Sequence, residues 1–272
     1  MLNHCLSLVK CHVFYVKNTT FQYLCCRNKY SKDMIIADSI RKVIELTSPG
    51  VVITINDFDI PSIYQPALVK ALSRYVAKGE IQKISKGKYY KPKNTIFGSL
   101  KPPISEVVKD LLESNGQIVG YTTGPSAFAE MGLTTQISSA IVVGSNKYRR
   151  PMKRAGYSIS FLLQPNIITA SNIPLLRILD AIRLFRDIPA TAPNDCIKEI
   201  CRVIKNLSME QINELTTLSF PYAPYVRALL GAILEHLGIT AESLRQSLNG
   251  VTSYKLPISE TTLPTKKNWN IR

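Results

Sequence analysis

The first hundred residues alternate between helix-like and strand-like hydrophobic patterns. Apolar residues recur at three- and four-residue spacing over 33–46, which predicts a first helix. A β-branched run over 51–54 predicts a short strand, and residues 56–58 predict a turn or a short helix. We expect a further helix to begin with Ser62 as its N-cap and to end at Gly79, since glycine commonly stops a helix.

The helix that begins near Ser62 has one apolar and one polar face. Its apolar stripe consists of Ala67, Leu68, Ala71, Leu72, Tyr75 and Val76. The opposite face carries Gln65, Val69, Lys70, Ser73, Arg74 and Lys78. Two strand-like segments follow over 81–84 and 88–91, and the Lys86-Gly87 turn between them predicts a hairpin. We therefore expect a helix with an exposed basic face, followed directly by a hairpin that carries further lysines.

This order of elements predicts a winged helix-turn-helix over residues 34–100, with the hairpin as its wing. A helix of this length fits the major groove of DNA, and a basic hairpin neutralises nearby phosphates. The residues expected to contact DNA are Ser62, Tyr64, Gln65, Lys70, Ser73, Arg74, Lys78, Lys83, Lys86, Lys88 and Lys91. The expected base readers among them are Tyr64, Gln65, Lys70, Ser73 and Arg74. A winged helix that contacts only protein is the alternative.

Beyond a proline-containing linker at 101–103, the pattern predicts a C-terminal domain over residues 101–256. Strands are expected over 117–121, 140–144 and 157–163. Helices are expected over 104–113, 126–132, 175–187, 195–206, 208–218, 222–237 and 240–248. Ser208 and Gln211 match a capping box, and the polar residues 257–272 predict an extended tail. The expected fold class is α+β: an N-terminal winged helix-turn-helix, then a mixed α/β segment, then a C-terminal helical bundle.

The charge of the chain favours a polyanionic partner. Its 34 Lys and Arg residues exceed its 19 Asp and Glu residues, for a formal net charge of +15. Residues 60–101 carry nine of the basic residues and one acidic residue, Glu80. A second basic cluster consists of Lys147, Arg149, Arg150, Lys153 and Arg154. For this cluster an extended DNA footprint, an RNA contact and simple solvation are all open.

Residues 1–33 lack the pattern of a folded segment, because Met1–Lys32 contains no acidic residue and no hydrophobic period. We expect them to be sequence upstream of a start at Met34, a disordered arm, or a basic arm that binds DNA. No apolar run approaches the length of a membrane span, and the six cysteines show no convincing zinc spacing. We therefore expect a cytoplasmic protein with reduced cysteines and no association with a membrane.

The residues that common catalytic mechanisms require are scarce. Two of the three histidines lie within residues 1–33, so His236 alone is left for a catalytic triad. No glycine-rich phosphate loop is present. Asp57 and Asp59 are spaced like metal ligands, but acids before a helix also stabilise its dipole. We expect no catalytic residue, no metal and no cofactor, and hence no enzyme; a nucleic-acid-processing enzyme is the alternative.

Two blocks of the sequence resemble AbiEi-like antitoxins, which belong to bacterial type IV toxin–antitoxin and abortive infection systems. The first block consists of Pro66–Arg74, Gly79–Ile81 and Ser85–Pro92, and lies within the expected winged helix. The second consists of Tyr121–Ala127 and Met131–Gln136. The resemblance covers residues 34–190, and beyond Ala190 we find no position-by-position match.

The resemblance implies a cytoplasmic bacterial repressor of its own operon that takes part in phage defence. It implies that the winged helix binds double-stranded DNA at inverted repeats of its own promoter. It also implies that the C-terminal part counters a nucleotidyltransferase-like toxin without forming a stable complex with it. A winged-helix regulator or interaction module with no connection to a toxin is the alternative.

Overall fold

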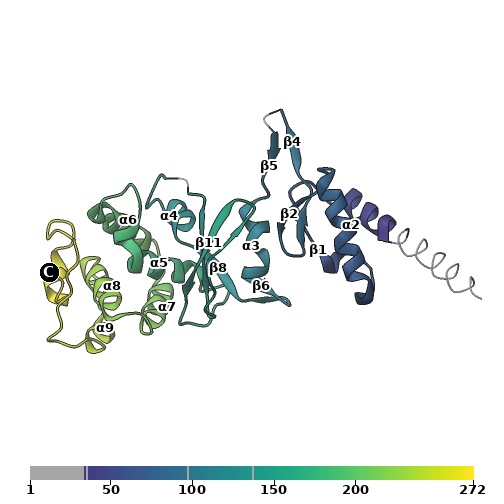
Figure 1. The fold of residues 1–272 in the computed structure, drawn as a ribbon. Helices are drawn as coiled ribbons and strands as arrows, with labels where there is room; N and C mark the ends of the chain where they lie inside the picture. The colour runs from purple at the N-terminus through teal and green to yellow at the C-terminus, as the bar shows by residue number, and fades with distance from the viewer. Residues whose placement is uncertain (1–33, 35, 97, 137) are drawn as a thin grey trace, which may run out of the picture. The chain divides into compact units, whose positions relative to one another are not determined.

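A computed structural model describes residue 34 and residues 36–96, 98–136 and 138–272. The expectations for residues 1–33 therefore lie outside the described residues. The structure is mixed α+β, with several helices and small sheets, and it divides into two compact units after Lys101 (Figure 1). We call the part up to Lys101 the N-terminal unit and Pro102–Arg272 the C-terminal unit.

The N-terminal unit combines helices with a small antiparallel sheet. Residues 36–46 are helical, which confirms the first helix expected from the sequence. The elements that follow are β1 (Val52–Thr54), the 3-10 helices η1 (Ile55–Asp57) and η2 (Ser62–Tyr64), α2 (Gln65–Ala77), β2 (Gln82–Ser85) and β3 (Lys88–Tyr90). The strands pair in the order β1-β3-β2, so the expected hairpin of β2 and β3 is also confirmed.

One apolar core holds the N-terminal unit together. Ile40 of the first helix, Leu68 and Leu72 of α2, and Tyr89 of β3 are all buried in it. Leu68 and Leu72 are four residues apart and therefore lie on one face of α2. Burial of that face leaves the opposite face of α2 to solvent.

The start of α2 differs from the sequence prediction. Ser62 begins η2 and does not cap α2, whose N-cap is Tyr64 and has no side-chain capping hydrogen bond. The backbone N–H of Tyr64 donates to the carbonyl of Pro61 at 2.9 Å, which closes a tight turn before α2. Pro66 lies in the first turn of α2, where a missing N–H costs little. Pro61 and Pro66 restrict the backbone before and after η2. The 3-10 turn of η2 therefore separates Ser62 from α2, the helix that Ser62 was expected to cap.

A second hairpin, formed by β4 (Lys93–Thr95) and β5 (Gly98–Leu100), is absent from the sequence prediction. Figure 1 shows it projecting from the N-terminal unit. Its described residues are exposed or half-buried, so no alternation of apolar residues marks it in the sequence. The Nε2 of Gln82 donates to the Oγ of Ser99 at 3.1 Å and ties this hairpin to β2.

A four-stranded sheet forms the first part of the C-terminal unit, in the order β10-β11-β9-β8. Strands β9 and β11 are parallel, whereas β10 and β8 pair antiparallel at the two edges. The elements of this part are α3 (Ile104–Leu112), β6 (Glu113–Ser114), β7 (Gln117–Ile118), β8 (Gly120–Thr123), α4 (Pro125–Glu130), β9 (Ala140–Ser145), β10 (Met152–Arg154) and β11 (Tyr157–Leu163). Strand β10 was not expected from the sequence, because three residues are too few to show a period.

The second part of the C-terminal unit is helical. Its elements are α5 (Ile173–Leu184), η3 (Phe185–Asp187), α6 (Pro193–Lys205), α7 (Met209–Ser219), α8 (Pro224–His236), α9 (Glu242–Gln246) and the 3-10 helix η4 (Pro264–Trp269). The expected capping box is confirmed: Ser208 Oγ accepts from the Gln211 N–H at 3.3 Å, and Gln211 Oε1 accepts from the Ser208 N–H at 3.0 Å. Within the described ranges, no helix combines the length and the apolar character that a bilayer crossing requires.

The end of the chain corrects the sequence prediction of an extended tail over 257–272. Ile258, Leu263, Trp269 and Ile271 are buried in the main core of the C-terminal unit. Trp269 packs on α8 so closely that a Cβ added to Gly231 would lie 2.2 Å from its ring. The segment is polar in composition, and its few apolar residues are buried although their spacing in the sequence follows no helix or strand period. Hydrophobic periodicity could therefore not reveal this packing.

Candidate nucleic-acid interface

The exposed face of α2 carries most of the expected DNA contacts. Lys70 and Arg74 are exposed and lie four residues apart, hence on one stripe of the helix. Among the residues that the structure describes, no carboxylate pairs with either of them. Gln65 is exposed at the start of the helix, and the exposed Ser73 donates its hydroxyl to the Val69 carbonyl at 2.9 Å. The α2 face is therefore basic, and the Ser73 oxygen keeps its capacity to accept a hydrogen bond.

Three further expected DNA contacts, Lys78, Tyr64 and Ser62, lie in different surroundings at the two ends of α2. Lys78 continues the stripe of Lys70 and Arg74, but its Nζ lies 3.9 Å from the Glu80 carboxylate and 5.6 Å from the centre of the Tyr75 ring. Both members of the Lys78–Glu80 pair are largely exposed, so their attraction is weak and does not hold the lysine in place. Tyr64 is half-buried against the apolar core, whereas Ser62 is exposed on η2.

The β2–β3 hairpin places its lysines beside a short, fixed turn. Lys83 and Lys86 are exposed, and no carboxylate pairs with them in the described part of the chain. Gly87 has a φ of +72°, and its carbonyl accepts from the Ile55 N–H at 3.2 Å. Lys88 is half-buried at the start of β3. The turn is thus held against η1 while the two exposed lysines point into solvent.

Lys91 does not fit the DNA contact that the sequence predicted for it. Its Nζ donates to the carbonyl of Ile44 at 3.0 Å, in the last turn of the first helix. Cations are favourable there because the last carbonyls of a helix are unpaired and its C-terminus carries partial negative charge. β3 ends at Tyr90, one residue before Lys91, so the strand pattern did not reveal this inward contact.

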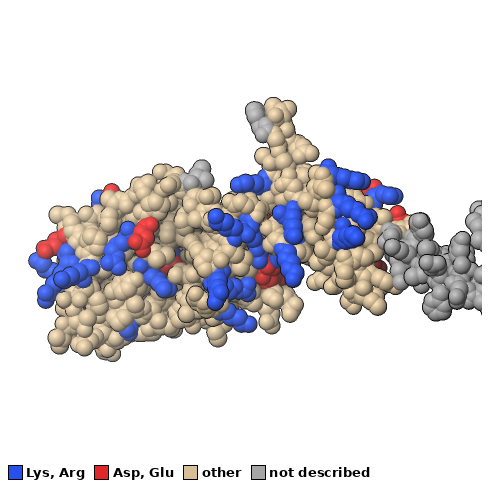
Figure 2. Space-filling model, viewed as in Figure 1, with Lys and Arg blue, Asp and Glu red and all other residues tan. Residues whose placement is uncertain are grey.

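Figure 2 shows how these charges are distributed in one view of the molecule. Lys and Arg side chains cover the region of α2 and the β2–β3 hairpin, with few Asp or Glu side chains among them. The carboxylate of Asp57, which the sequence left open as a metal ligand, accepts from the Thr54 N–H at 2.6 Å and from its hydroxyl at 3.0 Å. Asp57 is the last residue of η1 and completes a capping box with Thr54, so it stabilises the start of η1 and not, as the sequence suggested, the helix that follows Pro61.

The second basic cluster is divided by the structure. Lys147, Arg150 and Lys153 are exposed, and Arg149 lies with its guanidinium 5.9 Å from the centre of the Phe161 ring. Arg154 is buried instead, and binds Asp110 with two nitrogens at 2.7 and 3.2 Å. Arg154 also donates to the Val107 carbonyl at 3.1 Å, so it joins β10 to α3 and is not available to a ligand.

A buried carboxylate, which the sequence reasoning did not single out, lies in the C-terminal unit. Asp180 accepts hydrogen bonds from Tyr121 (2.6 Å), Thr123 (2.9 Å) and Tyr222 (3.2 Å). Gln164 Nε2 donates to both tyrosine hydroxyls at 2.7 Å. Burial raises the pKa of Asp180 to about 6, although the hydrogen bonds that it accepts lower it in part. Asp180 has no exposed surface, so we assign this network to the core and not to chemistry on a substrate.

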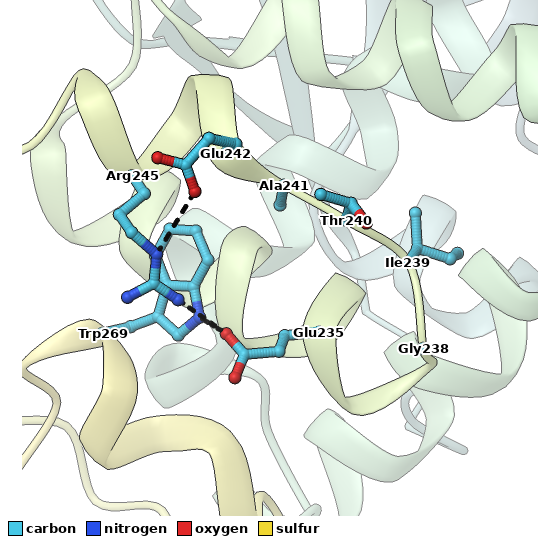
Figure 3. A pocket seen from close by; sticks show the side chains of 8 residues that line it. All are labelled: Glu235, Gly238, Ile239, Thr240, Ala241, Glu242, Arg245 and Trp269. Atoms are coloured by element: carbon cyan, nitrogen blue, oxygen red, sulfur yellow. Dashed lines mark hydrogen bonds and ion pairs between the residues drawn. The ribbon is translucent and has the colours of Figure 1, made fainter.

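A pocket of about 350 Å³ lies at the C-terminal end of α8 (Figure 3). Glu235 accepts from Trp269 Nε1 at 2.6 Å and from Arg245 Nη2 at 2.9 Å, and Arg245 lies over the Trp269 ring. Figure 3 shows these three side chains pointing toward one another. They thus bond each other and anchor η4. No group of three or more His, Cys, Asp or Glu side chains in the described ranges could hold a metal ion, and Cys196 and Cys201 are buried free thiols.

Comparison with known proteins gives a family but no activity. One solved structure, titled "Crystal structure of RV2827C protein from Mycobacterium tuberculosis", is similar at 13 % identity and a TM-score of 0.45, over 80 % of this chain and 83 % of that chain. A search of the curated proteins finds no significant match. The profile of a family of unknown function, DUF6088, matches residues 39–212. That match spans both units and more than half of the sequence, and the chain therefore belongs to the DUF6088 family.

Proposed function

We propose that the N-terminal unit is a winged helix that binds double-stranded DNA, with α2 in the major groove and the β2–β3 hairpin as the wing. The order of elements supports this proposal: a helix, β1, short 3-10 helices, α2, and then the hairpin. The pairing β1-β3-β2 also supports it, because it places the strand before α2 in one sheet with both strands of the hairpin. α2 has 13 residues, and a helix of this size is about 20 Å long, enough to follow a major groove.

The observation that carries the proposal is that Lys70 and Arg74 of α2 are exposed cations with no carboxylate partner among the described residues. The same holds for Lys83 and Lys86 of the hairpin. Surface cations that have no carboxylate partner within the described residues need not break an ion pair before they bind phosphate. Each phosphate that they neutralise releases counterions, which supplies much of the affinity for DNA. We assign Gln65, Lys70, Ser73 and Arg74 to the groove and Lys83, Lys86 and Lys88 to the backbone.

The test is binding to a labelled fragment from immediately upstream of the protein's own gene, against scrambled DNA, at several salt concentrations. We expect roughly a thousandfold preference for the upstream fragment and a steep salt dependence. Arg74→Ala is expected to weaken specific binding about 5- to 100-fold and to relax selectivity at one position. Lys86→Ala is expected to weaken binding to all sequences and to lower the salt slope by about one.

Lys205→Ala is the matched control, because Lys205 is an exposed lysine on α6, outside the N-terminal unit. It is expected to leave DNA binding unchanged. Equal, weak binding to both DNA fragments would contradict a role as a specific regulator. Binding that is insensitive to salt and to Arg74→Ala would favour a winged helix that contacts protein.

The resemblance to AbiEi-like antitoxins extends this proposal. On that basis the chain is a cytoplasmic repressor of its own operon, and its C-terminal unit counters a nucleotidyltransferase-like toxin. Co-expression with such a toxin from the neighbouring gene tests this role, and we expect growth to be restored. A variant with Lys70→Ala and Arg74→Ala separates the two activities, because it is expected to lose repression and to retain neutralisation. Failure of the unaltered chain to restore growth would remove the antitoxin role and leave the DNA-binding proposal intact.

A further inference from the structure

We infer that the loop between β9 and β10, residues 146–151, is a second nucleic-acid-binding surface, which takes single-stranded nucleic acid by stacking a base on Tyr148. This inference lies outside the proposed function, because it concerns the C-terminal unit and a different form of nucleic acid. Four consecutive side chains of the loop form the surface: Lys147, Tyr148, Arg149 and Arg150.

The loop is held in place at its beginning. Asn146 Nδ2 donates to the carbonyls of Gln164 and Asn166, at 2.7 and 2.6 Å. The Lys147 N–H donates to the Ser145 hydroxyl at 3.3 Å. The two Asn146 bonds join the start of the loop to the segment that follows β11, and the Lys147–Ser145 bond fixes the turn out of β9. The loop therefore presents its side chains from a fixed start. A fixed loop loses less conformational entropy when a ligand binds.

Tyr148 is the most exposed aromatic side chain at any described position of the C-terminal unit, with 81 % of its surface accessible. A tyrosine ring is a large apolar surface, and stacking on a nucleobase covers its face. Stacking needs a base whose face is free. Bases in a duplex are already stacked on their neighbours, so the ring fits an unpaired strand better than a double helix.

The cations that flank Tyr148 are available to the phosphates of such a strand. No described carboxylate pairs with Lys147, Arg149 or Arg150, and the nearby Asp110 is bound by Arg154. Arg149 is steadied by its position over the ring of Phe161 on β11, at 5.9 Å. In the sequence, Tyr148 follows Lys147 and is followed by Arg149 and Arg150, so the loop offers an exposed ring and three cations within four residues. An aromatic platform bordered by cations is the usual arrangement for sequence-tolerant binding of single strands.

Lys153 belongs to the same basic cluster but not to this surface. Successive residues of a strand point to opposite faces, and Lys153 pairs with Ser158, whereas Arg154 pairs with Tyr157. Phe161 shares the face of Tyr157 and Arg154, because it lies four residues further along β11. Lys153 thus points away from the face on which Arg149 lies. It provides a matched control: an exposed cation close in sequence but on the other face of the sheet.

The test measures binding of the full chain to fluorescent oligonucleotides of about ten nucleotides, as single-stranded RNA, single-stranded DNA and duplex DNA. We expect Tyr148→Ala to weaken binding of the single strands about 5- to 150-fold, and Tyr148→Phe to retain it, because phenylalanine keeps the ring. Arg150→Ala is expected to weaken single-strand binding, and Lys153→Ala to leave it unchanged. The RNA and DNA arms decide which single strand is preferred.

The same measurements on a Lys70→Ala, Arg74→Ala variant separate this inference from the proposed function. That variant is expected to lose duplex binding and to keep single-strand binding. Unchanged single-strand affinity in Tyr148→Ala would overturn the inference. So would an equal loss of duplex binding in Tyr148→Ala, since the loop would then only extend a duplex footprint. Equal effects of Arg150→Ala and Lys153→Ala would also overturn it, because they would show a diffuse charge effect and not a defined surface.

Discussion

The two units of the protein differ in where their charged residues lie. Residues 1–101 carry 16 Lys and Arg residues against 6 Asp and Glu residues, and on α2 and the β2–β3 hairpin several of these cations are exposed. Residues 102–272 carry 18 against 13, and there some charged groups are built into the interior. Asp180 is fully buried, and Arg154 is buried and bound to Asp110.

The difference separates charge that is available for binding from charge that is needed for folding. A buried charge is tolerated only when hydrogen bonds or an opposite charge replace its hydration, so its partners cannot be removed without a large cost. An exposed cation contributes little to stability and is free to bind an anion. Substitution of a buried charged group should therefore affect folding, whereas substitution of an exposed, unpaired cation should affect binding.

The largest effect is expected from Asp180→Ala. This substitution removes the acceptor for three buried hydroxyls, those of Tyr121, Thr123 and Tyr222. Leaving buried donors without partners should lower the free energy of unfolding by about 3–5 kcal/mol. Trp269 is the only tryptophan of the chain and lies in the C-terminal unit, so its fluorescence during denaturant unfolding measures this change. Asp187→Ala, at an exposed position close by, is the control, and equal stability of the two variants would contradict the prediction.

The second prediction concerns the pH dependence of stability. Burial raises the pKa of Asp180 from its usual 3.8 to about 6, so the folded state favours the protonated form. The stability that follows from this shift is fully present below pH 3.8 and is lost as the pH rises through about 6. Relative to Asp180→Asn, the unaltered protein should lose about 2 kcal/mol of unfolding free energy between pH 4 and pH 7. Parallel stability curves for the two proteins would show that the carboxylate does not titrate in this range.

The third prediction tests whether the end of the chain is part of the core. A Cβ at Gly231 would lie 2.2–2.6 Å from three ring atoms of Trp269, so Gly231→Ala should displace the ring. We expect a loss of about 2 kcal/mol and a red shift of the tryptophan emission. Gly250→Ala, where an added Cβ meets nothing within 4 Å, should change neither. An unshifted emission in Gly231→Ala would show that the segment does not pack as described.

The smallest effects compare two lysines of the N-terminal unit. Lys91 donates to the Ile44 carbonyl, and Lys91→Met should destabilise the end of the first helix by about 1 kcal/mol without weakening duplex binding. Lys86 is exposed, and Lys86→Met should have the opposite effect, with weaker duplex binding and nearly unchanged stability. Amide hydrogen exchange in the first helix measures the change in stability, and DNA titrations at two salt concentrations measure the change in duplex affinity. If Lys91→Met and Lys86→Met changed stability and duplex affinity to the same extent, the distinction between a lysine bonded within the fold and a lysine exposed for binding would be wrong.

Much of the local structure could be predicted from the sequence. The first helix, the β2–β3 hairpin and the helix with Leu68 and Leu72 on one face follow from regular periods and turn residues. These elements are specified by neighbouring residues, so a local pattern is enough to find them. The β4–β5 hairpin was missed because it buries no apolar face, and the packed end of the chain because its apolar residues have no period.

The position of the basic face on α2 was also determined by the sequence, since burial of one helical stripe leaves the other exposed. The role of each individual charge was decided only by the tertiary structure. Lys91, Arg154 and Asp180 contact partners that lie 47, 44 and 59 residues away in the chain, namely Ile44, Asp110 and Tyr121. No local pattern encodes such contacts. The period of a helix depends on its own residues, whereas the partner of a buried charge depends on how distant elements pack together.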